Sequence, residues 1–239
     1  MINKQDIKVE ILKYPTEQDW LWAKTCTLNT VGKKLKSTTK EVDFDYKHKL
    51  LLSEHSPIRE LWFGIKLYIP YYISVHIVRH HIGCNHYVST QRDDRHPERD
   101  VSREDLPQGQ FVSHILSINA QELMFFMRKR LCNQADPLMR YVANIIKQEV
   151  LKTNPEFEGL LVPLCEYRNG KCTEMFPCEK AKIFEVKEKL INKAVEKVYN
   201  VDAYLNPGSI QNIVQIENKR IAEEFGEKAF EIIDYDKMR

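Results

Sequence analysis

Side chains that can bind an anion and a flat, hydrogen-bonding ring are concentrated between Val78 and Arg95. This segment reads VRHHIGCNHYVSTQRDDR, and its arginines, histidines, serine and glutamine surround a single glycine. Arginine presents a rigid fork of donors that matches a phosphate, and imidazole, hydroxyl and amide groups add further donors and acceptors. The segment therefore indicates a site for a phosphorylated ring compound; the alternative is a helix end followed by a polar surface loop.

Regular elements on both sides would hold this segment in position. Upstream, the pattern predicts a strand at 7–13, a helix that begins at a Thr16–Asp19 capping box and runs to about Thr27, a basic loop at 31–40, a helix at 42–53 and a strand at 61–69. Pro70 then begins a helix that carries Arg79 at its C-terminal end, on the same face as His76.

A polar, irregular stretch follows the segment and runs to Gly109; such stretches in a compact domain are usually functional or mobile. Two amphipathic helices come next, one after Asn119 and one that begins at Asp136-Pro137. Their apolar stripes fit core packing. Their polar residues need another role, and these are Asn119, Gln121, Arg130 and Arg140.

The 78–95 segment resembles the signature of the flavin-dependent thymidylate synthases, which reads RHR-x7-S. The corresponding residues here are Arg79, His80, His81 and Ser89. In that family a segment of the form H-x-T/S-P-F-x-H precedes the signature. Ser56-Pro57 falls on its central pair, while glutamates stand at both histidine positions.

A second family motif combines Asn-x-Arg with an arginine eleven residues after the Asn. It falls on Asn119, Gln121 and Arg130, and a later Ala-Gln-Trp-Glu-Ile-Arg run falls on 135–140. Eleven residues are three helical turns, so Asn119 and Arg130 should share a helix face. Two spaced motifs in the right order are more specific than either alone.

The resemblance implies an α+β fold in which a small sheet packs against long helices. The expected domain is 1–179, whose end (159–179) is rich in cysteine. Beyond it, outside the resemblance, the apolar periodicity predicts a helical C-terminal extension at 180–239. The resemblance also implies methylation of dUMP to dTMP, with methylenetetrahydrofolate as carbon donor, FAD as cofactor and NADPH as reductant. The family's active sites form between subunits of a homotetramer, so a homotetramer is expected here.

The resemblance also implies roles for individual residues. Arg130 would lie against the uracil edge, where negative charge develops, and Ser89 would cradle the dUMP phosphate; these two are the expected catalytic residues. The expected cofactor-binding residues are Ser56, Arg79, His80, His81, Asn119 and Gln121. The expected substrate-binding residues are His76, Arg79, Tyr87, Ser89, Thr90, Gln91, Arg92 and Arg130.

Four positions depart from the family pattern. His81, Gln91 and Gln121 stand where the family has arginine, and Tyr87 stands where it usually has an acid. Replacing arginine at a bidentate phosphate contact is not conservative. The alternatives are therefore a paralogue that binds a pyrimidine nucleotide or flavin without turnover, and a relative that transfers hydroxymethyl instead of methyl.

Cysteines suggest a separate structural site. Cys165, Cys172 and Cys178 follow a C-x6-C-x5-C pattern, and Cys132 would be a fourth ligand. Four thiolates suit tetrahedral zinc, but this spacing is not that of zinc ribbons, so a loop of unligated thiols is the alternative. A zinc-stabilised helical interaction domain without a nucleotide site is the corresponding rival function.

Composition narrows the class of protein. The 239 residues are 43% hydrophobic and 29% charged, with a net charge of +2, which describes a globular chain and argues against binding nucleic acid. The sequence contains no apolar run of membrane-spanning length and no apolar signal core at its start, so we expect a cytoplasmic location without membrane contact.

Overall fold

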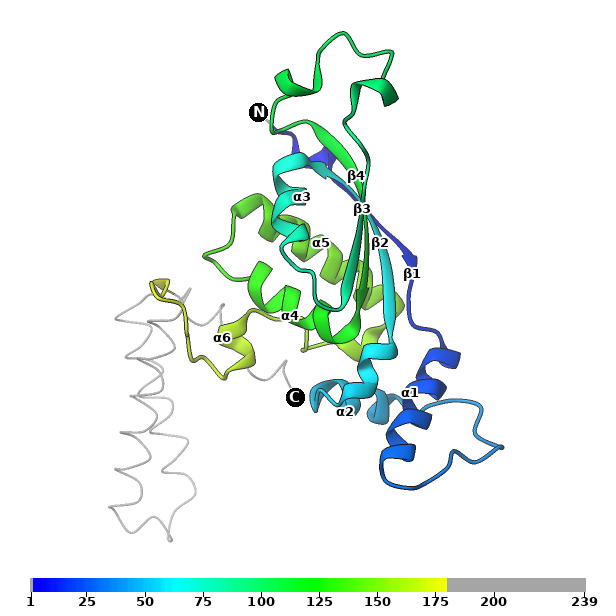
Figure 1. Cartoon of the computed structure of the whole chain (residues 1–239). Helices are drawn as coiled ribbons and strands as arrows, with labels where there is room; N and C mark the ends of the chain where they lie inside the picture. Colours follow the sequence, from blue (N-terminus) through cyan, green and yellow to red (C-terminus); the bar gives the residue numbers. More distant parts are fainter. Residues whose placement is uncertain (1, 180–239) are drawn as a thin grey trace, which may run out of the picture. The chain divides into compact units, whose positions relative to one another are not determined.

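The computed structural model describes residues 2–179, and its ordered core is a sheet with helices packed on it (Figure 1). The elements are β1 (Lys8–Lys13), α1 (Glu17–Thr30), α2 (Phe44–Leu52), β2 (Trp62–Pro70), α3 (Tyr71–Val78), β3 (Cys84–Val88), β4 (Phe111–Asn119), α4 (Ala120–Arg130), α5 (Pro137–Thr153) and α6 (Leu164–Tyr167). This arrangement confirms the predicted α+β fold class.

All four strands form one antiparallel sheet in the order β1-β2-β4-β3. The two central strands pair along their whole length, from Trp62 opposite Asn119 to Pro70 opposite Phe111. The short strand β3 lies at one edge, with Cys84 opposite Ile118. Strand β3 was not predicted from the sequence; part of the signature segment is an edge strand.

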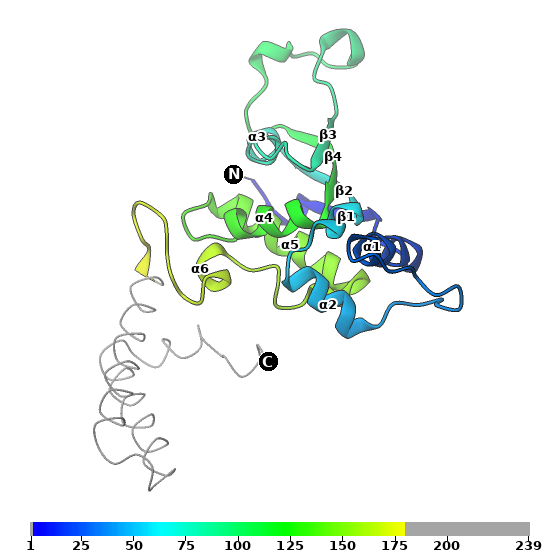
Figure 2. The ribbon, with the colours of Figure 1, turned by 60° about the horizontal axis from the view of Figure 1, so that its bottom comes forward.

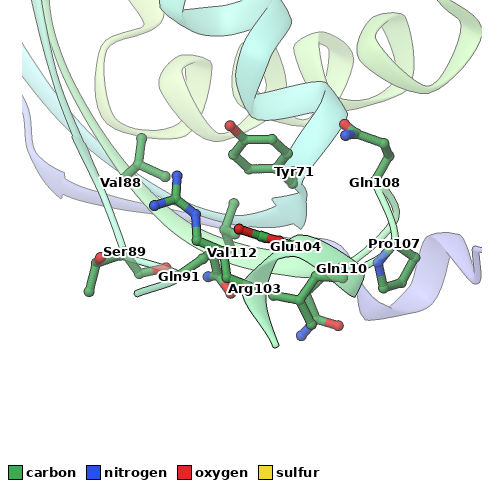
Figure 3. Close-up of a pocket in the computed structure, with 12 residues that line it drawn as sticks. Tyr71, Val88, Ser89, Gln91, Arg103, Glu104, Pro107, Gln108, Gln110 and Val112 are labelled. Carbon is green, nitrogen blue, oxygen red and sulfur yellow. The ribbon is translucent and has the colours of Figure 1, made fainter. Parts of the chain in front are cut away.

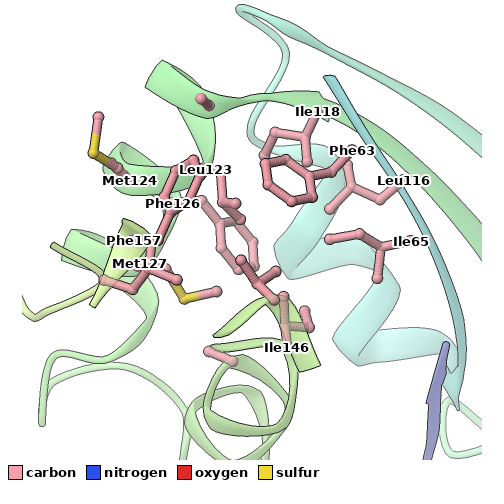
Figure 4. Packing of buried hydrophobic residues seen from close by; sticks show 14 of the residues in the cluster. Phe63, Ile65, Leu116, Ile118, Leu123, Met124, Phe126, Met127, Ile146 and Phe157 are labelled. Atoms are coloured by element: carbon pink, nitrogen blue, oxygen red, sulfur yellow. The ribbon is translucent and has the colours of Figure 1, made fainter. Parts of the chain in front are cut away.

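Helices α3, α4 and α5 cover one face of the sheet, and α4 and α5 lie side by side on it (Figures 1 and 2). Alternation of apolar and polar residues along β2 and β4 produces this face, since successive side chains point to opposite sides. Figure 4 shows the resulting core, in which the labelled residues are Phe63, Ile65, Leu116, Ile118, Leu123, Met124, Phe126, Met127, Ile146 and Phe157. Each fully buried side chain of this kind stabilises the fold by about 1.5–3 kcal/mol.

Side-chain caps set the beginnings of the helices around the site. Thr16 and Asp19 form the predicted capping box of α1, and Asp136 accepts hydrogen bonds from two backbone amides at the start of α5. Asn119 caps α4, because its Oδ1 accepts from the amide of Glu122 at 3.0 Å. The helix ends predicted from the sequence agree with these elements to within a few residues.

The chain divides into two compact units, Met1–Leu164 and Cys165–Arg239. In the second unit, the amide of Gly170 donates to the carbonyl oxygen of Cys165 at 2.7 Å and closes a tight turn. The predicted helices at 180–239 lie outside the described residues. Among residues 2–179, no helix is both long and apolar enough to cross a membrane.

Candidate functional site

The His80 cluster, formed by His80, Glu122 and Arg130, lies where the C-terminal end of α3 meets α4. His80 Nδ1 lies 2.8 Å from Glu122 Oε1, and Arg130 Nε donates to His80 Nε2 at 3.0 Å. Arg130 Nη2 also donates to the carbonyl oxygen of His76 at 2.6 Å. The imidazole is buried, with its edges against Phe125 and Phe126. Arg130 is therefore held from two directions.

The charge at this end of the sheet is positive. Burial lowers the pKa of Arg130, and the nearby guanidinium of Arg79 lowers it further. Arg130 nevertheless keeps its positive charge, because the guanidinium group is so basic. Two neighbouring cations, one of them half-buried, favour an anion or a group on which negative charge develops.

Asn119 contacts the same short segment that contains His80. Its backbone amide donates to the carbonyl oxygen of Gly83 at 2.9 Å. Gly83 has a φ of +74°. Asn119 thus reaches Gly83 from the start of α4 while Arg130 reaches His80 from its end. The two residues stand at opposite ends of α4, about 16 Å apart along its axis, and their sharing of a helix face stays a prediction.

The other predicted cofactor-binding residues lie on nearby elements. Gln121, in the first turn of α4, accepts a hydrogen bond from Arg59 Nε at 2.5 Å. Arg59 and Ser56 lie in the 3-10 turn Ser56–Glu60, and both are exposed. His81 is also exposed, and its Nδ1 lies 3.1 Å from the carbonyl oxygen of Arg79.

A second region of interest is a pocket of about 320 Å³ beyond the end of β3 (Figure 3). Ser89, Thr90 and Gln91 line it from the strand side, and Tyr71 lines it from the start of α3. The remaining lining residues are Val88, Arg103, Glu104, Leu106, Pro107, Gln108, Gln110 and Val112. Hydroxyl, amide and guanidinium groups give the pocket both donors and acceptors for a polar ligand.

The arginines of the 89–110 loop have different partners. Arg92 forms a bidentate ion pair with Asp94, at 2.8 and 2.9 Å, and does not line the pocket. Arg99 donates to Asp93 at 2.9 Å and to the backbone oxygen of Gln91 at 2.8 Å. Arg103 lines the pocket, and within residues 2–179 its guanidinium forms no ion pair. Arg103 is therefore the cation available to a ligand there.

The two regions lie at opposite ends of β3. His80 precedes this strand and Ser89 follows it, so about 16 Å of extended chain separates the residues before and after the strand. The structure brings Arg79, His80 and Arg130 together, with Asn119 at the opposite end of α4. It does not bring Ser89, Thr90, Gln91 or Arg92 beside them in the same chain, and Tyr87 is an exposed residue on β3.

A chain of polar groups, in which Ser74 and His114 are buried and His86 is partly buried, leads to the backbone of His80. Ser74 Oγ lies 3.0 Å from His114 Nδ1, His114 Nε2 lies 3.1 Å from His86 Nδ1, and His86 Nε2 lies 2.5 Å from the carbonyl oxygen of His80. Burial, together with the nearby His86, lowers the pKa of His114 to about 4. Both histidines therefore connect α3 to the backbone of the signature segment.

Two properties of the cysteines bear on their predicted roles, namely the basicity of the Cys84 thiol and the grouping of possible metal ligands. Burial, with Glu122 nearby, raises the pKa of the Cys84 thiol to about 11, so it is not a thiolate at neutral pH. Within residues 2–179, no three His, Cys, Asp or Glu side chains are grouped to hold a metal ion. Cys132 belongs to the first compact unit and the other three predicted ligands to the second, so the zinc site stays a prediction.

Three residues of these regions were not identified from the sequence, namely Arg59, Arg103 and Glu122. Glu122 had a detectable signal, because it stands three residues after the helix-capping Asn119. Arg59 and Arg103 had none, since their proximity to Gln121 and to Ser89 depends on how distant segments of the chain pack.

Comparison with one solved structure confirms the fold. The structure is similar to thymidylate synthase X from Helicobacter pylori, solved with FAD and dUMP, with a TM-score of 0.50, 13% identity, and 65% of this chain and 99% of that one covered. It is also similar to the UMP/dUMP methylase PolB from Streptomyces cacaoi, bound with 5-Br dUMP, with a TM-score of 0.48, 16% identity, and 66% and 97% covered. No protein-family model matches the sequence, and no curated protein matches it. The chain has the fold of the flavin-dependent thymidylate synthases, as the sequence resemblance predicted.

Proposed function

We propose that this protein methylates dUMP, or a close pyrimidine nucleotide, in a reaction that uses FAD. The observation that carries the proposal is the fixed guanidinium of Arg130, bonded to His80 and to the His76 carbonyl beside the second cation Arg79. The fold that positions Arg130 is similar to that of a thymidylate synthase solved with FAD and dUMP. A fixed cation of this kind stabilises negative charge on a pyrimidine ring without reorganisation.

The residues at this end of the sheet fit a flavin dinucleotide. The exposed guanidinium groups of Arg59 and Arg79 suit its phosphates, and the Gln121 amide and Ser56 hydroxyl add neutral hydrogen-bonding groups. When bound, the flavin would supply the hydride for reduction of the transferred carbon. NADPH and methylenetetrahydrofolate are the proposed reductant and carbon donor, as the family resemblance implies.

The protein's own contribution would be binding, orientation and placement of charge. Arg130 would face the uracil edge, and its two fixed hydrogen bonds would limit its movement during the reaction. Ser89, Thr90 and Arg103 would hold the phosphate in the pocket beyond β3. The two regions lie apart in one chain, so we propose a homotetramer in which one subunit's pocket completes another's His80 cluster.

A visible absorption spectrum tests the proposal directly. The purified protein is mixed with FAD, desalted, and measured before and after addition of dUMP. A retained flavin band that dUMP perturbs supports the proposal, and turnover with methylenetetrahydrofolate and NADPH should then yield dTMP by mass. A protein that retains no flavin contradicts it. Flavin retention without any product would instead favour a paralogue that binds without catalysis.

A further inference from the structure

Glu122 has no role in the sequence resemblance, yet it contacts a central residue of the site. It is the third residue of α4, and in a standard capping box its carboxylate would bond back to the amide of the capping residue. Here the backbone amide of Asn119 already donates to the carbonyl oxygen of Gly83. The Glu122 carboxylate reaches His80 Nδ1 instead, at 2.8 Å.

The geometry determines which nitrogen of His80 carries the proton. Arg130 Nε always bears a hydrogen and therefore donates, so His80 Nε2, 3.0 Å away, must accept. The imidazole is then neutral with its hydrogen on Nδ1, directed at the Glu122 carboxylate. In the other tautomer two N–H groups would face each other at Arg130, and Glu122 would face a bare nitrogen. A carboxylate on one imidazole nitrogen is a general means of fixing the tautomer at the other.

We propose that Glu122 is a positioning residue for Arg130 and acts by holding His80 in the Nδ1–H tautomer. Its contact with His80 is buried, with side-chain exposures of 5% for His80 and 12% for Glu122, so water competes weakly for either group. Loss of the carboxylate removes one of the two contacts that favour this tautomer and leaves only that with Arg130 Nε, so the second tautomer, which offers Arg130 Nε no acceptor, becomes more accessible. The guanidinium then retains only its bond to the His76 carbonyl.

The inference rests on the proposed function, because it assumes that Arg130 contacts a pyrimidine nucleotide. Its own test is the tautomer of His80, read from imidazole nitrogen shifts of protein labelled with ¹⁵N-histidine, with His80→Gln identifying the signal. We expect the Nδ1–H form in the wild type and a mixture in Glu122→Gln, whose amide can face either tautomer. Glu122→Asp, which keeps the charge, should recover the Nδ1–H form in large part.

Nucleotide binding supplies the second readout. Glu122→Gln should weaken dUMP binding to the FAD-loaded protein about ten-fold, whereas in an Arg130→Ala background it should add less than about two-fold. The matched control is Glu149→Gln, which removes the same charge from the ion pair with Lys152 on α5 and should not change either readout.

Two results would overturn the inference. One is a His80 tautomer that does not depend on Glu122. The other is an equal loss of dUMP affinity with and without Arg130, which would mean that Glu122 only stabilises the fold. If the wild type binds no dUMP, the proposed function fails, and the tautomer comparison alone still decides the role of Glu122.

Discussion

The backbone amide of Asn119 donates a 2.9 Å hydrogen bond to the carbonyl oxygen of Gly83, and this contact joins the start of α4 to the turn before β3. The turn requires glycine for two reasons. Its φ of +74° is unfavourable for other residues, and a Cβ atom would lie 2.7 Å from Asn119 Nδ2. The site therefore depends on a residue that takes no part in its chemistry.

Gly83→Ala should destabilise the protein strongly and disturb the His80 cluster. We expect a loss of about 3 kcal/mol, because strain at positive φ adds to the collision with Asn119. Gly159→Ala is the matched control, since Gly159 has a φ of +75° with nothing within 4 Å of the added Cβ, and it should lose only about 1 kcal/mol. Urea unfolding measures both. Equal losses would show that Asn119 moves aside at no cost.

Local signals in the sequence predicted most of the fold. The Thr16–Asp19 box, Pro70 and Asp136-Pro137 act within a few residues of the elements they begin, so the helices at these points were predicted correctly. Strand β3 was missed because it is only five residues long and lies in a segment rich in polar residues, and it forms by pairing with β4, more than twenty residues away. Its pairing partner, not its composition, makes it a strand.

The site was predicted less completely than the fold. Motif spacing selected Arg79, His80 and Arg130, which the structure brings together, and Asn119, which contacts Gly83 three residues after His80. It did not show that Ser89 lies at the other end of a strand from them, because β3 was not predicted. Arg92 was predicted as a substrate contact from its position one residue from that of the family arginine, but its bidentate pair with Asp94 depends on the local turn.

The glutamate at one of the family's histidine positions has a structural partner. Glu54 pairs with Arg128, whose side chain is 9% exposed, through both carboxylate oxygens. Glu54→Ala should lose about 3–5 kcal/mol of stability, because it leaves a buried guanidinium without this carboxylate. Adding Arg128→Met should recover most of the loss.

A surface pair provides the control for this prediction. Glu149→Ala, which breaks the Lys152 pair on α5, should change the free energy of unfolding by less than about 1 kcal/mol. Thermal or urea unfolding distinguishes the cases. If the double variant were no more stable than Glu54→Ala, the ion pair would not explain the loss.

Stability should fall in mild acid because of His114. Its pKa in the folded protein is about 4, below its usual 6.5, so between these values the unfolded chain binds a proton that the folded chain does not. The contribution is complete above pH 6.5 and is lost as the pH falls towards 4, by roughly 3 kcal/mol in total. Urea unfolding between pH 7.5 and 4.5 measures this loss.

Two variants identify the source of the acid sensitivity. His114→Gln, which keeps a donor and an acceptor, should flatten the pH dependence even if it lowers stability at pH 7.5. His81→Gln should retain the wild-type acid sensitivity, because His114 is intact in it and His81 is exposed. Unchanged acid sensitivity in His114→Gln would assign it to other groups.

Arg103, and not Arg92, should provide the cation for the nucleotide phosphate. Arg103 lines the pocket beside Ser89 and forms no ion pair within the described residues, whereas Arg92 is already paired with Asp94. Arg103→Ala should raise the Kd for dUMP about 10- to 100-fold, which is the loss expected for a charge-assisted contact. Binding of deoxyuridine, which has no phosphate, should not change.

Arg103→Lys should recover only part of the affinity, because an ammonium group lacks the planar fork of donors. Arg92→Ala is the matched control and should change the Kd less than about three-fold. Equal losses in the two alanine variants, or an equal loss for deoxyuridine, would mean that the pocket does not bind the phosphate through Arg103.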